Sequence, residues 1–196
     1  YPSKYEAAFK NYYDAIFGPF KPYVLAGLEK IKDLPVELCC NSHGPVLTKG
    51  GRLEYAKERY AEWSQPQKNE RLTVPVFYTS AYGNTRKVAS AIREGILEAK
   101  PDAAVECYDI IEHDMGKLAA LLNSSDAFAL GSPTINGDAV PPSWMLLAHV
   151  DAVNNKKKPV LVFGSYGWSG EAVPNLSARL TGLKMSLFGE GYKVCF

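Results

Sequence analysis

The sequence lacks the features that several functional classes require. Its 22 basic and 21 acidic side chains leave a formal net charge of +1, whereas a nucleic-acid-binding surface needs a concentrated basic excess. The only basic run, residues 156–158, stands directly before a proline and an apolar stretch and has the character of a solvated turn. No apolar run is long enough to span a bilayer, and the polar, aromatic N-terminus does not resemble a signal peptide. We therefore expect no nucleic-acid partner, no membrane partner and a cytoplasmic location.

Cysteine is sparse and is arranged without a metal or disulfide pattern. Of the four cysteines, Cys39 and Cys40 are adjacent, and Cys107 and Cys195 lie in strand-like runs. This spacing matches neither a zinc motif nor an evident disulfide framework. We expect four buried, reduced thiols.

A short polar segment with one proline, residues 65–71, has the composition of a linker and divides the chain. The part before it has helical patterns at residues 5–17, at 22–32 and around Leu53, Ala56, Tyr60 and Trp63, and a strand candidate at 36–40. So few strands cannot close a sheet of their own. We therefore expect residues 1–68 to be the tail end of a larger domain and residues 69–196 to be a second domain.

After the linker, strands alternate regularly with helices. Strands are predicted at 72–78, 104–108, 126–131 and 159–164, with a last β region at 185–196. Helices are predicted at 84–99, 114–122 and 172–182, with another one opened by Pro141 and Pro142. Alternation of this kind indicates βαβ crossovers and a parallel sheet covered on both faces. The expected fold class is therefore α/β, with a doubly wound parallel sheet of five strands.

Ligands of open parallel sheets bind beyond the carboxyl ends of the strands, and the first of these ends carries a loop suited to phosphate. Its hydroxyls can donate hydrogen bonds, Gly83 allows close approach of the backbone, and the following helix points free N–H groups at an anion. The loop lacks the lysine of an ATP-binding P-loop and does not fit G-x-G-x-x-G, so a terminal monophosphate fits better. An ordinary strand-to-helix turn is the alternative, and we expect Arg86 and Lys87 to point to solvent. The candidate phosphate-binding residues are Thr79, Ser80, Ala81, Tyr82, Gly83, Asn84 and Thr85.

Two further polar, glycine-bounded loops are expected at the ends of the third and fourth strands of this half. In the first, backbone amides and Asn136 can contact the polar edge of a flavin ring, and Gly137 permits a positive φ. In the second, Tyr166 or Trp168 can stack on an isoalloxazine ring. The alternatives are a surface loop of turn formers and a pair of aromatics packed into the adjacent core. The candidate ring-binding residues are Ser132, Pro133, Thr134, Asn136 and Gly137 in the loop 131–138, and Ser165, Tyr166, Gly167, Trp168 and Gly170 in the loop 164–171.

With these loops, the second part of the chain resembles a flavodoxin-like domain. The segment from Tyr78 to Thr85 aligns without gaps to the phosphate loop of that family, with Tyr82 in place of the threonine before the glycine. The exchange removes a threonine hydroxyl donor, and the tyrosine can cover the site instead. The resemblance implies a 2-1-3-4-5 strand order with flavin mononucleotide (FMN) at the point where the order reverses.

The first part sharpens the resemblance. Two segments resemble the end of a metallo-β-lactamase-like domain, namely Asn41–Val46 and the helix end Tyr60–Ser64. A lactamase-like domain joined to a flavodoxin-like domain is the arrangement of the flavodiiron proteins, or A-type flavoproteins, which this chain resembles along essentially its whole length. The resemblance implies a mainly helical C-terminal fragment of the lactamase-like domain at 1–68 and an FMN-binding domain at 69–196.

The family resemblance implies an oxidoreductase in which FMN takes electrons from rubredoxin or a similar donor and passes them to a di-iron site that reduces oxygen or nitric oxide. It also implies a head-to-tail homodimer, and it identifies His43 as one iron ligand. The other ligands would lie upstream of this chain, no residue here is assigned to catalysis, and His113 and His149 fit no ligand pattern. One alternative is a stand-alone flavodoxin-like electron carrier without di-iron chemistry. Another is a signalling receiver domain, which would need acidic residues where Thr79 and Ser132 stand.

The chain stops at Phe196 in a strand, where a doubly wound sheet normally adds a further helix. We expect the chain to be truncated at both ends. Hydrophobic surface around Leu187, Val194 and Phe196 is then expected to be exposed.

Overall fold

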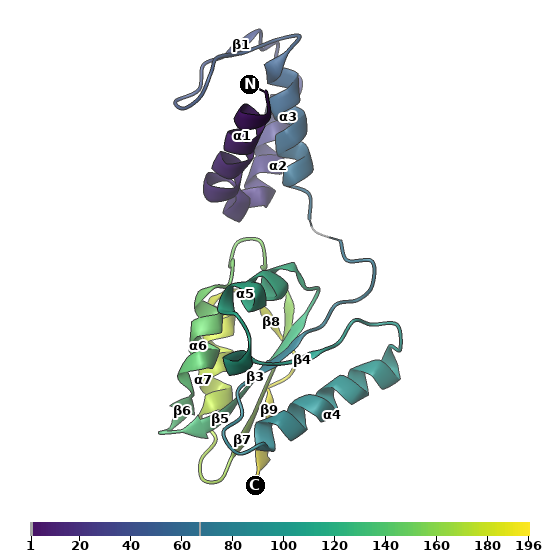
Figure 1. Cartoon of the computed structure of the whole chain (residues 1–196), viewed down its shortest axis with the longest axis vertical. Helices are drawn as coiled ribbons and strands as arrows, with labels where there is room; N and C mark the ends of the chain where they lie inside the picture. Colours follow the sequence, from purple (N-terminus) through teal and green to yellow (C-terminus); the bar gives the residue numbers. More distant parts are fainter. Residues whose placement is uncertain (1, 67) are drawn as a thin grey trace. The chain divides into compact units, whose positions relative to one another are not determined.

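The computed structural model describes residues 2–66 and 68–196. Contacts between Cα atoms divide the chain into two compact units, Tyr1–Gln67 and Lys68–Phe196 (Figure 1). The assignment of the first unit to a metallo-β-lactamase-like domain stays a prediction.

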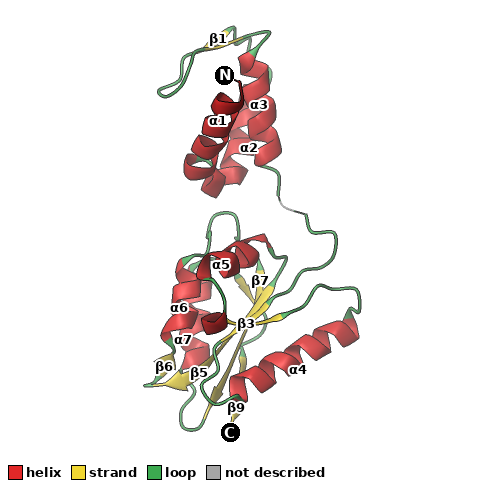
Figure 2. Ribbon diagram, viewed as in Figure 1, coloured by secondary structure: helices red, strands yellow, loops and turns green. Residues whose placement is uncertain are grey.

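The first unit consists of helices and one short hairpin (Figure 2). Its elements are α1 (Pro2–Ile16), the 3₁₀ turn η1 (Gly18–Phe20), α2 (Lys21–Ile31), β1 (Leu38–Cys39), β2 (Leu47–Thr48) and α3 (Arg52–Trp63). Helices α1 and α3 pack through aromatic rings. The Tyr13 ring is fully buried, with its centroid 5.1 Å from that of Tyr60 and 5.2 Å from that of Trp63. Its hydroxyl lies 2.6 Å from Ser64 Oγ, so the buried polar end has a hydrogen-bond partner.

The second unit is a parallel sheet with helices on both faces. Its strands are β3 (Val76–Tyr78), β4 (Cys107–Asp109), β5 (Phe128–Ile135), β6 (Asp138–Ala139), β7 (Pro159–Tyr166), β8 (Ser186–Leu187) and β9 (Tyr192–Cys195). Its helices are α4 (Asn84–Ala99), the 3₁₀ turn η2 (Ile110–Glu112), α5 (Met115–Ser124), α6 (Pro141–Ala148) and α7 (Ala172–Gly182).

The strand order is β4-β3-β5-β7, followed by β8 and β9, which both pair with β7. All of these pairings are parallel, and only β6 pairs antiparallel, with β5. Two short strands therefore share the last position, and the expected 2-1-3-4-5 order of a flavodoxin-like α/β fold is confirmed.

The helices cover the sheet because each presents one apolar face to it. In α4, Val88, Ile92 and Ile96 recur every four residues, as an amphipathic helix requires, and they pack on one face of the sheet. On the other face, α5, α6 and α7 pack on Phe128, Leu130 and their neighbours from β5 and β7. Because β3, β5 and β7 pair in parallel, their carboxyl ends lie at the same end of the sheet (Figure 2).

The predicted loop at 131–138 is largely strand, which corrects the sequence-based expectation. Strand β5 continues through Ile135, and its partner β6 returns from Asp138. Only Asn136 and Gly137 stand between the paired residues, with φ of 54° and 71°. Two central residues with positive φ are what a type I′ hairpin turn requires, so the expected positive φ at Gly137 is confirmed within a hairpin.

The expectation of four buried thiols is also wrong. All four cysteines are free, but Cys40 and Cys195 are exposed and Cys39 and Cys107 are only partly buried. Their location differs from that of the central strands, because Cys39 ends β1, Cys40 follows it, Cys107 lies in β4 at the edge of the sheet and Cys195 lies in the short strand β9.

At the end of the chain, Phe196 is 53% exposed, whereas Leu187 and Val194 are partly buried. The expected exposed hydrophobic surface is therefore present at Phe196 and reduced at the other two. Within the described residues, no helix combines the length and the apolar character that crossing a membrane would need.

Candidate functional site

The loop after β3 leads directly into the N-terminus of α4. Gly83 precedes the helix with a left-handed φ of 82°, and a Cβ added there would meet no atom within 4 Å. Open space therefore adjoins the first turn of the helix, where backbone N–H groups have no partner within the helix. This is the geometry expected for an anion site, in which the N–H groups and the helix dipole face the anion.

The hydroxyl of Thr79, at the start of this loop, is buried and unpaired. Its Oγ1 has no hydrogen-bond partner among the described residues, although only 7% of the residue is exposed. A buried hydroxyl without a partner is unfavourable, so an unexplained one indicates a missing ligand or water. The neighbouring Ser80 Oγ accepts a hydrogen bond from the backbone N–H of Arg86 at 3.2 Å and keeps its own proton for another acceptor.

The third hydroxyl of the loop has a different environment. Thr85 Oγ1 lies 2.8 Å from Ser165 Oγ, and both residues are buried. This contact joins the first turn of α4 to β7. The structure thus brings the first and third predicted loops together through hydroxyls that bond to each other.

The hydroxyls of the second predicted loop hold the backbone. Ser132 Oγ accepts a hydrogen bond from the backbone N–H of Val140 at 3.0 Å and donates one to the carbonyl of Pro133 at 2.8 Å. Thr134 Oγ1 accepts a hydrogen bond from the N–H of Ala172 at 3.2 Å, in the first turn of α7. These side chains therefore fix β5 against β6 and α7.

A hollow of about 450 Å³ lies between the second and third loops. It is lined by Thr134, Asn136, Gly137, Tyr166, Gly167, Trp168 and Ser169. Trp168 is 97% exposed on this rim, so the alternative in which it packs into the core is wrong. Tyr166 differs, because a Cβ on Gly170 would come within 3.2 Å of the Tyr166 ring, which is therefore packed against that backbone. In the first loop, Tyr82 is 89% exposed.

The Arg86 side chain is 54% exposed, as the sequence-based expectation of a solvent-facing residue implies, but its guanidinium also has fixed partners. Its Nε donates to the Tyr78 hydroxyl at 3.1 Å, and its Nη2 lies 3.3 Å from Asp109 Oδ2. Burial raises the pKa of Tyr78, and the hydrogen bond to that hydroxyl, followed by the bond to Asp109, raises the pKa of Arg86. Sequence reasoning missed this network. The available signal was a cation in the first turn of a helix, where the dipole disfavours positive charge and a specific anionic partner is expected.

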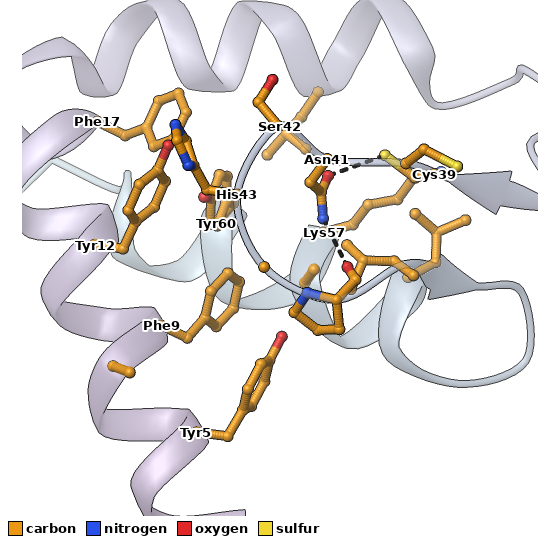
Figure 3. A pocket seen from close by; sticks show the side chains of 18 of the residues that line it. Tyr5, Phe9, Tyr12, Phe17, Cys39, Asn41, Ser42, His43, Lys57 and Tyr60 are labelled. Atoms are coloured by element: carbon orange, nitrogen blue, oxygen red, sulfur yellow. Dashed lines mark hydrogen bonds between the residues drawn. The ribbon is translucent and has the colours of Figure 1, made fainter.

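His43 lies in a separate apolar hollow of about 640 Å³ within the first unit (Figure 3). Aromatic side chains from α1 and α3 line it, and the His43 ring centroid is 6.0 Å from that of Tyr12. Burial raises the pKa of Tyr60, on the same wall, to about 12. The loop that carries His43 is fixed by Asn41, whose side-chain amide donates to the carbonyl of Pro45 at 3.2 Å.

A di-iron centre does not fit the described part of the chain. No three His, Cys, Asp or Glu side chains are grouped there in a way that could hold a metal ion. A single exposed imidazole cannot hold two irons.

Comparison with known proteins finds relatives whose alignments include both units. Residues 76–196 match the family described as Flavodoxin. The chain is 47% identical over 196 residues to the flavo-diiron protein FprA2 of Clostridium acetobutylicum, an alignment that covers 100% of this chain and 49% of that protein. It is 34% identical over 173 residues to the anaerobic nitric oxide reductase flavorubredoxin of Aeromonas hydrophila, covering 87% of this chain and 34% of that protein.

A solved structure also aligns with both units. The rubredoxin oxygen:oxidoreductase of Desulfovibrio gigas superposes with a TM-score of 0.69 at 25% identity, covering 94% of this chain and 45% of that one. The chain thus spans about half, or less, of the length of these relatives.

Proposed function

The chain belongs to the flavodoxin family through residues 76–196 and, along its length, to the flavodiiron or A-type flavoproteins, and from that premise we propose that its second unit binds FMN and transfers electrons. A rubredoxin-like donor would supply the electrons, and a di-iron site in the intact protein would use them to reduce oxygen or nitric oxide. The observation that carries the cofactor assignment is the buried, unpaired hydroxyl of Thr79 at the start of the loop before α4.

The residues of this loop fit the phosphate end of FMN. The Thr79 hydroxyl and the proton of Ser80 are available to donate to phosphate oxygens. The backbone N–H groups of Asn84 and Thr85 lie in the first turn of α4, where they have no acceptor within the helix. A cradle of hydroxyls and N–H groups with no lysine suits a terminal monophosphate.

The rim of the hollow between the second and third loops fits a flat ring. Trp168 on this rim is almost fully exposed, and a large exposed aromatic side chain can stack on a planar group that covers it. Tyr82, in the first loop, is also almost fully exposed. The type I′ turn at Asn136 and Gly137 presents its backbone at the same hollow. Bound FMN supplies the capacity to accept and release electrons. The protein's own residues bind the phosphate, orient the ring and cover it from water.

The iron pair belongs, in this proposal, to the part of the intact protein outside this chain, with His43 as one ligand. Its loop resembles the end of the lactamase-like domain, and imidazole is a suitable iron ligand. Two relatives carry rubredoxin in their names, which supports a rubredoxin-like donor. The relatives' names include both nitric oxide and oxygen reductases, so we propose no choice between them. The head-to-tail homodimer and the cytoplasmic location stay predictions.

A stand-alone flavodoxin-like electron carrier is not favoured. The alignment with the flavo-diiron protein FprA2 includes the first unit, which the flavodoxin match at 76–196 does not cover. A carrier with an unrelated extension would not share that first unit with a protein of this class.

The direct test is the absorption spectrum of the chain after it is mixed with FMN and desalted. We expect retained flavin absorption bands in the wild-type chain. Asn84→Asp keeps the shape of the side chain but places a negative charge at the phosphate cradle, so we expect it to lose the bands.

Asn11→Asp is the matched control, because it makes the same exchange on an exposed position of α1, outside the flavin-binding unit. We expect this variant to retain FMN as the wild type does. A folded wild-type chain that retains no flavin, or a loss of flavin in both variants, would contradict the assignment of the site.

A further inference from the structure

Arg86 links the first turn of α4 to the carboxyl end of β4. Besides its bonds to Tyr78 and Asp109, its Nη2 lies 3.3 Å from Glu112 Oε1. Asp109 is only 2% exposed, so its carboxylate requires a partner. The other carboxylate oxygen of Asp109 accepts the N–H of Ile111 at 3.4 Å, which holds the acid in place for Arg86.

The backbone of Arg86 holds the candidate phosphate loop. Its N–H donates to Ser80 Oγ, which closes residues 80–86 into a compact turn. Because Arg86 lies within a helix, its backbone position depends on where the side chain anchors that helix end. One residue thus connects the loop, through its N–H, to the edge of the sheet, through its guanidinium.

The charges around Arg86 matter for an anion bound nearby. Arg86 offsets one of the two negative charges of Asp109 and Glu112. Without it, two uncompensated carboxylates would stand close to the loop proposed to hold a phosphate. Negative charges would repel a bound phosphate, and salt screens this repulsion.

We propose that Arg86 is a positioning and specificity residue for the FMN phosphate, acting through Ser80 on the loop and through Asp109 and Glu112 on its charge. The inference rests on the FMN function proposed above. It implies that Arg86 favours FMN over riboflavin, which carries the same ring without the phosphate. A residue that only stabilised the fold would affect both flavins equally.

The test compares dissociation constants for FMN and riboflavin, measured by flavin-fluorescence titration of the full 196-residue chain. We expect Arg86→Met to raise the Kd for FMN by about tenfold, the order set by one hydrogen bond that a displaced Ser80 would no longer donate to the phosphate, and to change the Kd for riboflavin by less than about twofold. Arg86→Lys keeps the charge and should recover part of the preference for FMN. The deficit of Arg86→Met should shrink as the salt concentration rises.

Arg86→Met leaves the buried Asp109 without its counter-charge and can lower stability. The double variant Arg86→Met/Asp109→Asn removes both charges and keeps the question answerable in a folded protein. We expect its FMN-to-riboflavin preference to lie between those of the wild type and Arg86→Met. A folded double variant with the wild-type preference would show that Arg86 has no positioning role, and equal losses for both flavins in Arg86→Met would also overturn the proposal.

Arg93→Met is the matched control. Arg93 also reaches from α4 toward β4, donating to the carbonyl of Val105 at 3.2 Å and lying 3.9 Å from Glu106, but it stands seven residues, or roughly 10 Å, further along the helix. We expect Arg93→Met to leave the Kd values for FMN and riboflavin unchanged. An FMN deficit equal to that of Arg86→Met would mean that any lost positive charge on α4 has this effect, and that Arg86 has no specific role. A wild type that prefers FMN, with the same preference kept in Arg86→Met, overturns this inference alone, whereas a wild type that binds neither flavin overturns the proposed function as well.

Discussion

The hydroxyls of Thr85 and Ser165 lie 2.8 Å apart in the buried region between α4 and β7, although 80 residues separate them in the sequence. This bond holds the first turn of the helix against the third strand end of the candidate site. Its two partners come from two loops that sequence patterns identified independently. Hydroxyls that bond to each other in this way position the site more than they contact a ligand.

The Thr85 to Ser165 bond predicts strong coupling between two substitutions. Thr85→Val and Ser165→Ala should each lower the free energy of unfolding by about 1–3 kcal/mol, because each leaves one buried hydroxyl unpaired. The double variant should be about as stable as either single variant, since it removes both partners together. Urea unfolding of the four proteins measures the cycle. Additive losses would mean that the two hydroxyls do not depend on each other.

At Thr79 we expect the same exchange to valine to have the opposite effect on the free energy of unfolding. Thr79→Val removes a buried hydroxyl that has no partner among the described residues, so the flavin-free chain should become more stable by about 1 kcal/mol. The Kd for FMN should rise about tenfold, because one donor to the phosphate is lost. Urea unfolding and flavin titration measure the two effects. Lower stability together with unchanged FMN binding would refute the role given to Thr79. Thr85→Val is the matched exchange in the same loop, and it is expected to lower the free energy of unfolding because the Thr85 hydroxyl is paired with Ser165.

Trp168 should matter for flavin binding and not for folding. Since 97% of the residue is exposed, Trp168→Ala should change the free energy of unfolding by less than about 0.5 kcal/mol. It should lower the affinity for both FMN and riboflavin, because both carry the ring that the indole would cover. Phe188→Ala, at an exposed aromatic outside the hollow, is the control and should leave both affinities unchanged. If the two variants behave alike, Trp168 does not cover the ring.

Gly131 is required by packing. A Cβ at this position would lie 2.2 Å from a ring carbon of the buried Phe163, so Gly131→Ala should lower the free energy of unfolding by about 1–3 kcal/mol or more. At Gly95, in the interior of α4, a Cβ would meet nothing within 4 Å. Gly95→Ala should therefore stabilise the chain by about 0.5–1 kcal/mol. Urea unfolding compares the two, and equal effects would contradict the packing argument.

Lys158 predicts a pH dependence of stability. Its Nζ donates to the carbonyls of Leu122 and Asn123 at 2.8 and 3.0 Å, at the end of α5, and burial lowers its pKa from 10.5 to about 8. Between these values the unfolded chain holds a proton that the folded protein has released, so the contribution of Lys158 to stability rises with pH across that window. The stability difference between wild type and Lys158→Met should therefore rise from about pH 8 to about pH 10 and stay constant below that range. A flat difference would show that Lys158 keeps its ordinary pKa.

Much of the fold could be predicted from local patterns. The helix expected at 84–99 is confirmed at Asn84–Ala99, because Gly83 starts it in a left-handed conformation and Lys100-Pro101 follows its end. The helix boundaries depend on short segments. The strand order was implied only by the resemblance to flavodoxin-like domains, because right-handed crossovers alone leave several orders possible.

Other features depended on partners that local patterns do not reveal. The segment 131–135 reads as a loop of turn formers, yet it is strand because β7 pairs with it, with Ser132 opposite Gly164. The pair Asn136 and Gly137 carried a hairpin signal that could have located the turn. The acidic partners of Arg86 could not be predicted, because they lie 23 and 26 residues further along the chain.

The sequence by itself determined the class of fold, the three strand ends that carry the candidate site and the resemblance to flavodiiron proteins. The tertiary structure decided which groups at those ends are free to act. Thr79 and Thr85 are the same residue type in one loop, yet one hydroxyl is unpaired and the other is bonded to Ser165. The physical reason is that a hydroxyl's availability depends on what lies within hydrogen-bond distance, and that neighbour is set by the packing of α4 on β7, which no local pattern contains.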